Sequence, residues 1–130
     1  MSIRRIRSDG PWEEQYGYVR AVVAGDFVFV SGCTSTVDGE VRHEGDPYLQ
    51  TVTAFRVVEK ALAEVGLTLA DVVQTRMYIT HRRDADEVGR AHKDLFGQHP
   101  PTATMVVVKE LVDYRMLVEV EAVAYRGERT

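Results

Sequence analysis

The chain has 130 residues, of which 45% are hydrophobic and 28% charged, and its 16 basic and 20 acidic side chains give a formal net charge of −4. This length and composition are those of one folded domain, residues 1–130, with enough apolar side chains for a core. The negative charge removes the usual electrostatic basis for binding nucleic acid or an anionic membrane.

The start of the chain and its cysteine content favour a cytoplasmic protein. Residues 1–5 lack the apolar segment of a signal peptide, and no apolar run is long enough to span a membrane. Cys33 is the only cysteine, so no disulfide can form within the chain. We expect the first dozen residues and Gly127–Thr130 to be loose ends.

A β-hairpin and a helix are predicted in the first half of the chain. Residues 17–23 and 27–31 are rich in strand-forming side chains, and a short loop at Gly25 separates them. A helix is expected from Asp46–Pro47, a cap followed by a first-turn proline, to Gly66. Its apolar residues recur at steps of three and four and would cover a sheet: Tyr48, Val52, Phe55, Val58, Leu62 and Val65.

A strand and a second helix follow. Over residues 72–80, alternation predicts two faces, one with Val73, Thr75, Met77 and Ile79 and the other with Gln74, Arg76 and Tyr78. The next helix is expected after Asp84, which forms a capping-box pattern with Glu87, and to end before Pro100–Pro101. Its apolar stripe consists of Val88, Ala91, Leu95 and Phe96.

The last two predicted strands, residues 103–109 and 115–125, are joined by a turn near Asp113. In the second strand Glu119 and Glu121 share one face, flanked by apolar side chains, while the other face has Val118, Val120, Ala122 and Ala124. An apolar surface that contains carboxylates indicates a functional site or a subunit interface.

The order of these elements, βββ-α-β-α-ββ, predicts an α+β fold with two helices on one face of a sheet. If both helices cover one face, the apolar part of the other face needs a partner, and self-association would supply it.

Common signatures of metal and nucleotide chemistry are absent. The four histidines show no HxH or HExxH spacing, and there is no GxGxxG, P-loop or GxSxG motif, so we expect neither metal nor cofactor. Ser31-Gly32-Cys33 ends a strand, where the glycine either relieves crowding or opens a site. No adjacent residue would lower the pKa of Cys33, which favours a pocket wall or a packing residue over a nucleophile.

Taken together, five segments resemble the Rid family, also called YjgF/YER057c/UK114, which comprises reactive enamine/imine deaminases and their relatives. The segments are residues 17–22, 27–32, 54–62, 71–80 and 117–124. The resemblance implies a chorismate-mutase-like α+β subunit with a mainly antiparallel sheet, assembled into a homotrimer. It also implies that a small-molecule ligand binds in clefts between subunits.

The resemblance also implies roles for individual residues. Glu121 matches the family glutamate that positions the attacking water, and Tyr18 matches a cleft tyrosine. Backbone amides near Ser31-Gly32 and Met105 would polarise the substrate. The alternatives are an interfacial salt bridge of Glu121 with Arg76 or Arg20, and ordinary strand packing of Tyr18.

One segment departs from the family pattern. Deaminase members carry an arginine that binds the substrate carboxylate, and in Pro101-Thr102-Ala103-Thr104 an alanine, Ala103, takes its place. Arg76 is a candidate replacement. Met105, where members often have a small or thiol side chain, suggests a more apolar cleft.

Two functions follow from the resemblance. The first is cofactor-free hydrolysis of a non-standard imine or enamine to a carbonyl compound and ammonia. The alternative is a non-catalytic trimer that binds a small metabolite or has a regulatory role. Nuclease activity has little support in an acidic chain without metal-ligand or paired-histidine motifs.

Overall fold

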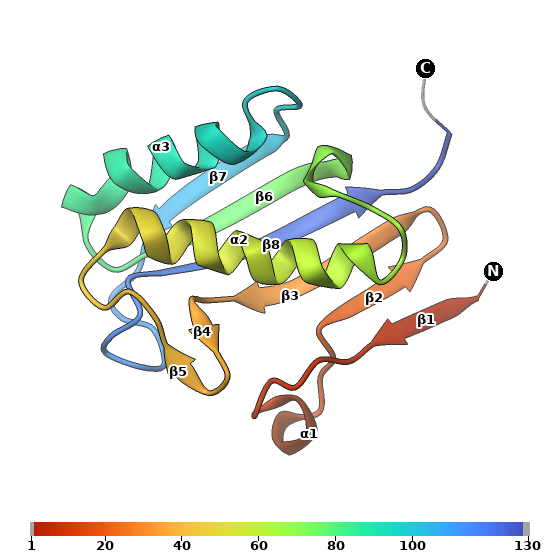
Figure 1. The fold of residues 1–130 in the computed structure, drawn as a ribbon, viewed down its shortest axis with the longest axis horizontal. Helices are drawn as coiled ribbons and strands as arrows, with labels where there is room; N and C mark the ends of the chain where they lie inside the picture. Colours follow the sequence, from red (N-terminus) through yellow and green to blue (C-terminus); the bar gives the residue numbers. More distant parts are fainter. Residues whose placement is uncertain (1, 129–130) are drawn as a thin grey trace.

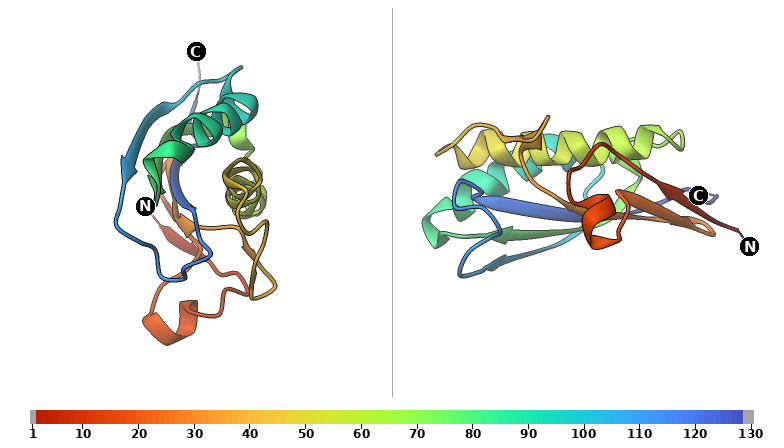
Figure 2. Two further views of the ribbon diagram at one scale, coloured as in Figure 1. Left: turned by 90° about the vertical axis from the view of Figure 1, so that its left-hand side faces the viewer. Right: turned by 90° about the horizontal axis from the view of Figure 1, so that it is seen from below.

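The structure is a computed structural model that describes residues 2–128. A six-stranded sheet carries two long helices on one face (Figures 1 and 2). The strand order is β1-β2-β3-β8-β6-β7, and neighbours are antiparallel except β6 and β7. The strands are β1 (Ile3–Ile6), β2 (Ala21–Ala24), β3 (Phe27–Cys33), β6 (Val72–Ile79), β7 (Thr102–Val107) and β8 (Val118–Tyr125).

The remaining elements lie on one face of this sheet or at its margin. The long helices are α2 (Pro47–Ala63) and α3 (Ala85–Phe96), and α1 (Glu13–Tyr16) is a single turn. Strands β4 (Thr36–Val37) and β5 (Glu40–Val41) form a small separate hairpin. The 3₁₀ turns are η1 (Leu69–Asp71) and η2 (Arg82–Asp84). The predicted α+β fold, with two helices on one face of a mainly antiparallel sheet, is confirmed.

Strand β8 lies in the middle of the sheet, between β3 and β6. Its side chains alternate as predicted: Val118, Val120, Ala122 and Ala124 are at most 3% exposed on the helix side. Glu119 and Glu121 are half-buried on the opposite side. We call that opposite side the open face, because neither α2 nor α3 covers it (Figure 2).

Helix α2 begins and ends for the predicted reasons. The Asp46 side chain accepts a hydrogen bond from the backbone N–H of Leu49 at 2.9 Å, and Pro47 occupies the first turn. Gly66, with φ of +75°, lies just beyond the end of the helix. Phe55, Val58 and Leu62 are fully buried against the sheet.

The predicted looseness of the chain start is wrong. Residues 3–6 pair with β2, and Ile6 enters the core. The predicted hairpin is confirmed, but its first strand begins at Ala21 rather than Gly17, because Gly17 ends α1 in the left-handed conformation. At the other end, residues 126–128 follow β8 without regular structure, and residues 129–130 lie outside the described part.

Two local predictions were also wrong. Asp84 makes no capping hydrogen bond, because it belongs to the turn η2 and has helical rather than extended backbone angles. A capping box forms instead at η1, between Thr68 and Asp71. A bulge at Val73 makes that residue 42% exposed and leaves Val72 in the core.

No helix within residues 2–128 is both long and apolar enough to cross a membrane.

His92 of α3 packs between the helices and the sheet. Its Nε2 shares a hydrogen bond of 2.8 Å with Oγ1 of the fully buried Thr75. The ring contacts Phe55 and Phe96, with ring centroids 5.7 and 4.6 Å away. Burial lowers the pKa of His92, so the folded state favours the neutral imidazole.

This burial predicts a pH dependence of stability. The unfolded chain binds a proton at His92 more readily than the folded chain, so the free energy of unfolding should decrease as the pH falls below the ordinary value of 6.5. Urea denaturation at several pH values measures this. His92→Gln keeps a polar partner for Thr75 but cannot titrate, and should lose less stability on acidification. Equal losses in both proteins would contradict the prediction.

Candidate functional site

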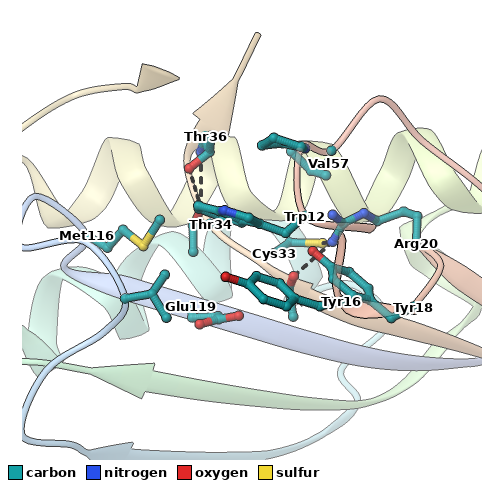
Figure 3. Close-up of a pocket in the computed structure, with 14 residues that line it drawn as sticks. Trp12, Tyr16, Tyr18, Arg20, Cys33, Thr34, Thr36, Val57, Met116 and Glu119 are labelled. Atoms are coloured by element: carbon teal, nitrogen blue, oxygen red, sulfur yellow. Dashed lines mark hydrogen bonds between the residues drawn. The ribbon is translucent and has the colours of Figure 1, made fainter. Parts of the chain in front are cut away.

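A cavity of about 410 Å³ opens where β3 ends, between α1, α2 and β8 (Figure 3). We call it the aromatic cavity. Three predicted site residues line it, Tyr18, Gly32 and Cys33. The other lining residues are Gly10, Pro11, Trp12, Tyr16, Arg20, Thr34, Thr36, Val57, Val112, Met116 and Glu119.

Glu119 reaches this cavity because residue 32 is a glycine. A Cβ at that position would clash with the Glu119 carboxylate. The β3–β8 register also shifts between Val30 and Cys33, which marks an irregularity at this point of the strand. Gly32 therefore relieves crowding, as one interpretation of the sequence held, and by doing so makes room for a carboxylate in the cavity.

The Glu119 side chain is partly shielded from water. Burial raises the pKa of its carboxyl group, the nearby charge of Glu121 adds to this, and Arg20 opposes it. Within residues 2–128, no hydrogen bond or ion pair engages the Glu119 carboxylate.

Glu121 lies one pleat further along β8, on the same face. It accepts a hydrogen bond from the hydroxyl of Tyr78, and this bond raises the pKa of the Tyr78 phenol. A groove of about 350 Å³ beside β8 is lined by Gly32, Tyr78, Val108, Glu110, Leu111, Glu119 and Glu121. We call it the carboxylate groove.

Arg76 is the cross-strand neighbour of Glu121 in the β6–β8 pairing. Both residues line a hollow of about 290 Å³ together with Phe29, Val30, Gln74, Ala122 and Val123. Within the one subunit described, Glu121 makes no salt bridge with Arg76 or Arg20 in residues 2–128, and an interfacial salt bridge stays a prediction. Arg76 is exposed, and in residues 2–128 its guanidinium has no hydrogen bond or ion pair.

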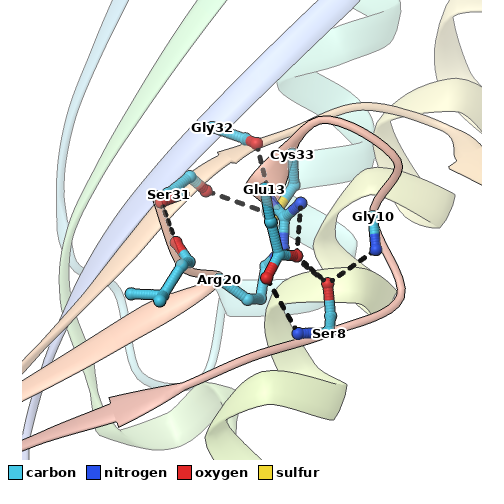
Figure 4. A network of polar contacts seen from close by, with 8 residues as sticks. Ser8, Gly10, Glu13, Arg20, Ser31, Gly32 and Cys33 are labelled. Atoms are coloured by element: carbon cyan, nitrogen blue, oxygen red, sulfur yellow. Dashed lines mark hydrogen bonds and ion pairs between the residues drawn. The ribbon is translucent and has the colours of Figure 1, made fainter. Parts of the chain in front are cut away.

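Arg20, by contrast, is committed to a buried network (Figure 4). Its guanidinium lies 3.6 Å from the Glu13 carboxylate and donates to the carbonyl of Gly32 at 2.8 Å. It also donates to Cys33 Sγ at 3.3 Å and to Ser8 Oγ at 3.4 Å. Arg20 and Glu13 are 9% and 4% exposed. Most of the Arg20 donors are therefore engaged within the subunit, and Glu13 neutralises its charge, so Arg20 is poorly suited to replace the missing arginine.

Cys33 is a buried wall of the aromatic cavity. The expectation that it lacks a cationic neighbour holds for the sequence but not for the fold, because Arg20 contacts its sulfur. Burial nevertheless outweighs the guanidinium and raises the pKa of the thiol to about 11. A thiol with this pKa is protonated at neutral pH, which favours a packing role over nucleophilic attack.

The remaining predicted residues lie elsewhere in the subunit. The Ser31 hydroxyl donates to the carbonyl of Val19 at 2.6 Å. On the edge strand β7, Ala103 is exposed and Met105 packs against the core. Their neighbours in the parallel pairing with β6 are Thr75 and Met77, which face the helices. Within one subunit, Ala103 and Met105 are thus not on the open face with Glu121.

Trp12, Tyr16 and Glu119 line the cavity but were not predicted as site residues. Glu119 was placed on the correct face, and its alternation with Val118 and Val120 was the signal for it. Trp12 and Tyr16 lie in and beside a one-turn helix, which has no periodicity to detect. In the described part of the chain, no group of three or more His, Cys, Asp or Glu side chains could hold a metal ion.

Comparison with known proteins identifies relatives of this chain. Residues 12–126 match the family model described as Endoribonuclease L-PSP. The uncharacterised protein SCO2049 of Streptomyces coelicolor is 48% identical over 97% of this chain and 94% of its own. TdcF of Escherichia coli K12, which is named as a reactive intermediate deaminase, is 30% identical over 85% of this chain and 87% of its own.

Solved structures agree with these matches. The crystal structure of Rv2704 from Mycobacterium tuberculosis, described as a member of the YjgF/YER057c/UK114 family, has a TM-score of 0.85 and 41% identity and covers 95% of this chain and 99% of its own. The structure of E. coli TdcF with bound serine has a TM-score of 0.78 and 27% identity, with coverage of 95% and 94%. With this fold, and with the family model spanning both glutamates of β8, the chain belongs to the YjgF/YER057c/UK114 (Rid) family.

Proposed function

We propose that this protein is a cofactor-free hydrolytic deaminase that acts on a small imine or enamine. Water adds to the carbon of the C=N bond, the nitrogen leaves as ammonia, and a carbonyl compound remains. The observation that carries this proposal is the Glu121 carboxylate, which the Tyr78 hydroxyl holds on the open face at the carboxylate groove. A carboxylate held in this way can orient water and accept its proton. The name of TdcF, a reactive intermediate deaminase, supports the same chemistry.

The substrate differs from that of deaminases with an anchoring arginine. Ala103 offers no charge, and Arg20 is neutralised by Glu13. Arg76 is a cation beside Glu121 without a partner in residues 2–128, and it is the group that would bind a carboxylated substrate. An uncharged imine would need no such anchor. Phosphate-rich substrates are disfavoured, because Glu119 and Glu121 would repel them.

The open face supports self-association. Phe27 and Phe29 are 43% and 49% exposed there, and the rings of Phe27 and Tyr125 lie 5.3 Å apart. Burying this patch would stabilise an assembly by the hydrophobic effect. We place the site in a cleft between subunits of a cytoplasmic homotrimer.

The trimer has a direct test. Sedimentation equilibrium should give three times the chain mass of 14.6 kDa. Phe29→Asp should dissociate the assembly, because a charge would be buried without a partner. Leu49→Asp, a similar change on the exposed side of α2, should leave the mass unchanged. A monomeric native protein would contradict the proposal.

The reaction can be measured with imines generated in place by amino-acid or amine oxidases, following release of ammonia and carbonyl product above the spontaneous rate. Glu121→Ala should slow the reaction about 10²-fold or more, because the water loses its proton acceptor. Arg76→Gln should slow only carboxylated imines. Ala103→Arg should accelerate those same substrates if the family arrangement forms in the trimer.

A second candidate is a non-catalytic trimer that binds a small metabolite or has a regulatory role. The observation that favours it is the missing arginine at Ala103, and the serine bound to TdcF shows a ligand in a relative. In the assay above, no native activity on any imine, with activity gained in Ala103→Arg, would overturn the deaminase proposal in favour of this one.

A further inference from the structure

We propose that the aromatic cavity binds a cationic organic group, a protonated amine or an iminium ion with an apolar substituent, between aromatic rings and the Glu119 carboxylate. The site lies within one subunit. Such a ligand carries a positive charge, whereas the substrates that an anchoring arginine would bind carry a negatively charged carboxylate.

Aromatic rings form part of the wall of the cavity. Trp12, Tyr16 and Tyr18, which lie directly before, at the end of and shortly after α1, line the same cavity as Glu119 (Figure 3). Tyr16 is 67% exposed, so part of this wall is accessible from solvent. Faces of aromatic rings carry negative potential and attract ammonium groups, and Trp does so most strongly.

The charged side chains of the cavity differ in whether they are compensated. The cavity contains two charged side chains, Arg20 and Glu119. Arg20 is compensated by Glu13, and most of its donors are occupied by the network that holds it. The Glu119 carboxylate has no hydrogen bond or ion pair in residues 2–128. The unsatisfied charge of the cavity is therefore negative.

The environment of Glu119 makes a positive ligand favourable. Burial disfavours its charged form, and Glu121 on the same strand face adds repulsion. A cation in the cavity would relieve both effects, whereas an anion would increase them. Glu119, the carboxylate inside the cavity, therefore attracts cations and repels anions.

The rest of the lining sets the size and polarity of the ligand. Val57, Val112, Met116 and the protonated thiol of Cys33 contribute apolar surface. A cavity of about 410 Å³ accommodates a ligand with a substituent as large as a phenyl ring. A small, strongly hydrated cation would leave most of this apolar surface unused.

Glu119 also connects the two hollows, because it lines both the aromatic cavity and the carboxylate groove that contains Glu121. A cationic nitrogen beside Glu119 would thus lie near the proposed catalytic carboxylate. If this ligand is the substrate, which rests on the proposed function, the substrates are iminium ions with bulky apolar substituents and without a carboxylate.

Trp12 gives the test a built-in reporter, since it is the only tryptophan in the chain. The probes are three compounds of similar shape at neutral pH: benzylammonium, benzyl alcohol and benzoate. Benzylammonium should change the Trp12 fluorescence saturably and bind about tenfold more tightly than benzyl alcohol. Benzoate should bind more weakly than either.

Matched variants locate the effect. Glu119→Gln is nearly isosteric and should remove the preference for benzylammonium over benzyl alcohol. Glu121→Gln changes the neighbouring carboxylate outside the cavity and should retain most of that preference. Tyr16→Leu, at an exposed ring, should weaken benzylammonium binding more than benzyl alcohol binding, and circular dichroism verifies the fold of each variant.

Equal affinities for the three probes, no saturable change, or a preference that survives in folded Glu119→Gln would overturn the inference. Its failure is distinguishable from failure of the proposed function. Imine hydrolysis without benzylammonium binding would leave the deaminase and remove the cation site. Binding without hydrolysis of any imine would leave the cation site and remove the deaminase.

Discussion

The alternation of side chains along β8 is the constraint on which the rest of the structure depends. This strand is paired on both sides, so its helix-facing residues form the middle of the core, with Val118, Val120 and Ala124 fully buried. A register shift of one residue would turn Glu119 and Glu121 toward α2. Burying each carboxylate there without a partner would cost roughly several kcal/mol. Packing of the core therefore fixes where the carboxylates lie. The acidic site is a consequence of the same pattern that builds the fold.

A second interaction places the wall of the aromatic cavity. Glu13 and Arg20 are both nearly buried, and each neutralises the other in a region that water reaches poorly. Ser8 joins the pair by donating its backbone N–H to Glu13 at 3.0 Å. These contacts tie the segment before β2 to the end of β3, although the segments are distant in the sequence. Trp12 precedes Glu13 and is positioned with it. A buried pair of this kind orders its surroundings because neither partner tolerates loss of the other.

Patterns that repeat over several residues were predictable from the sequence, and single irregularities were not. The alternation in β8 is supported by several residues that predict the same structure, and so are the cap and periodicity of α2. Both elements were confirmed. Strand β1 was missed because its four residues include Arg4 and Arg5 and show no apolar run. The bulge at Val73 could not be predicted, because the residues around it are all typical of a regular strand. The contact of Arg20 with Cys33 joins two strands and needs the tertiary fold. For the site, the family resemblance pointed to Glu121, Tyr18 and Gly32, while the aromatic cavity depends on how residues 8–16 fold back.

The two glutamates of β8 are separated by one residue, yet their surroundings differ in kind. Glu121 accepts a hydrogen bond from the Tyr78 phenol and has Arg76, with which it forms no ion pair in residues 2–128, as its cross-strand neighbour. Glu119 rests against the backbone of Gly32 among aromatic rings, where burial raises the pKa of its carboxyl group and a cation bound beside it would favour the charged form. Imine hydrolysis requires both a proton acceptor for water and a group that stabilises positive charge on nitrogen. Neighbouring carboxyl groups in different environments suit such a division of roles. This difference between Glu119 and Glu121 arises from the glycine at position 32 together with the alternation of side chains along β8.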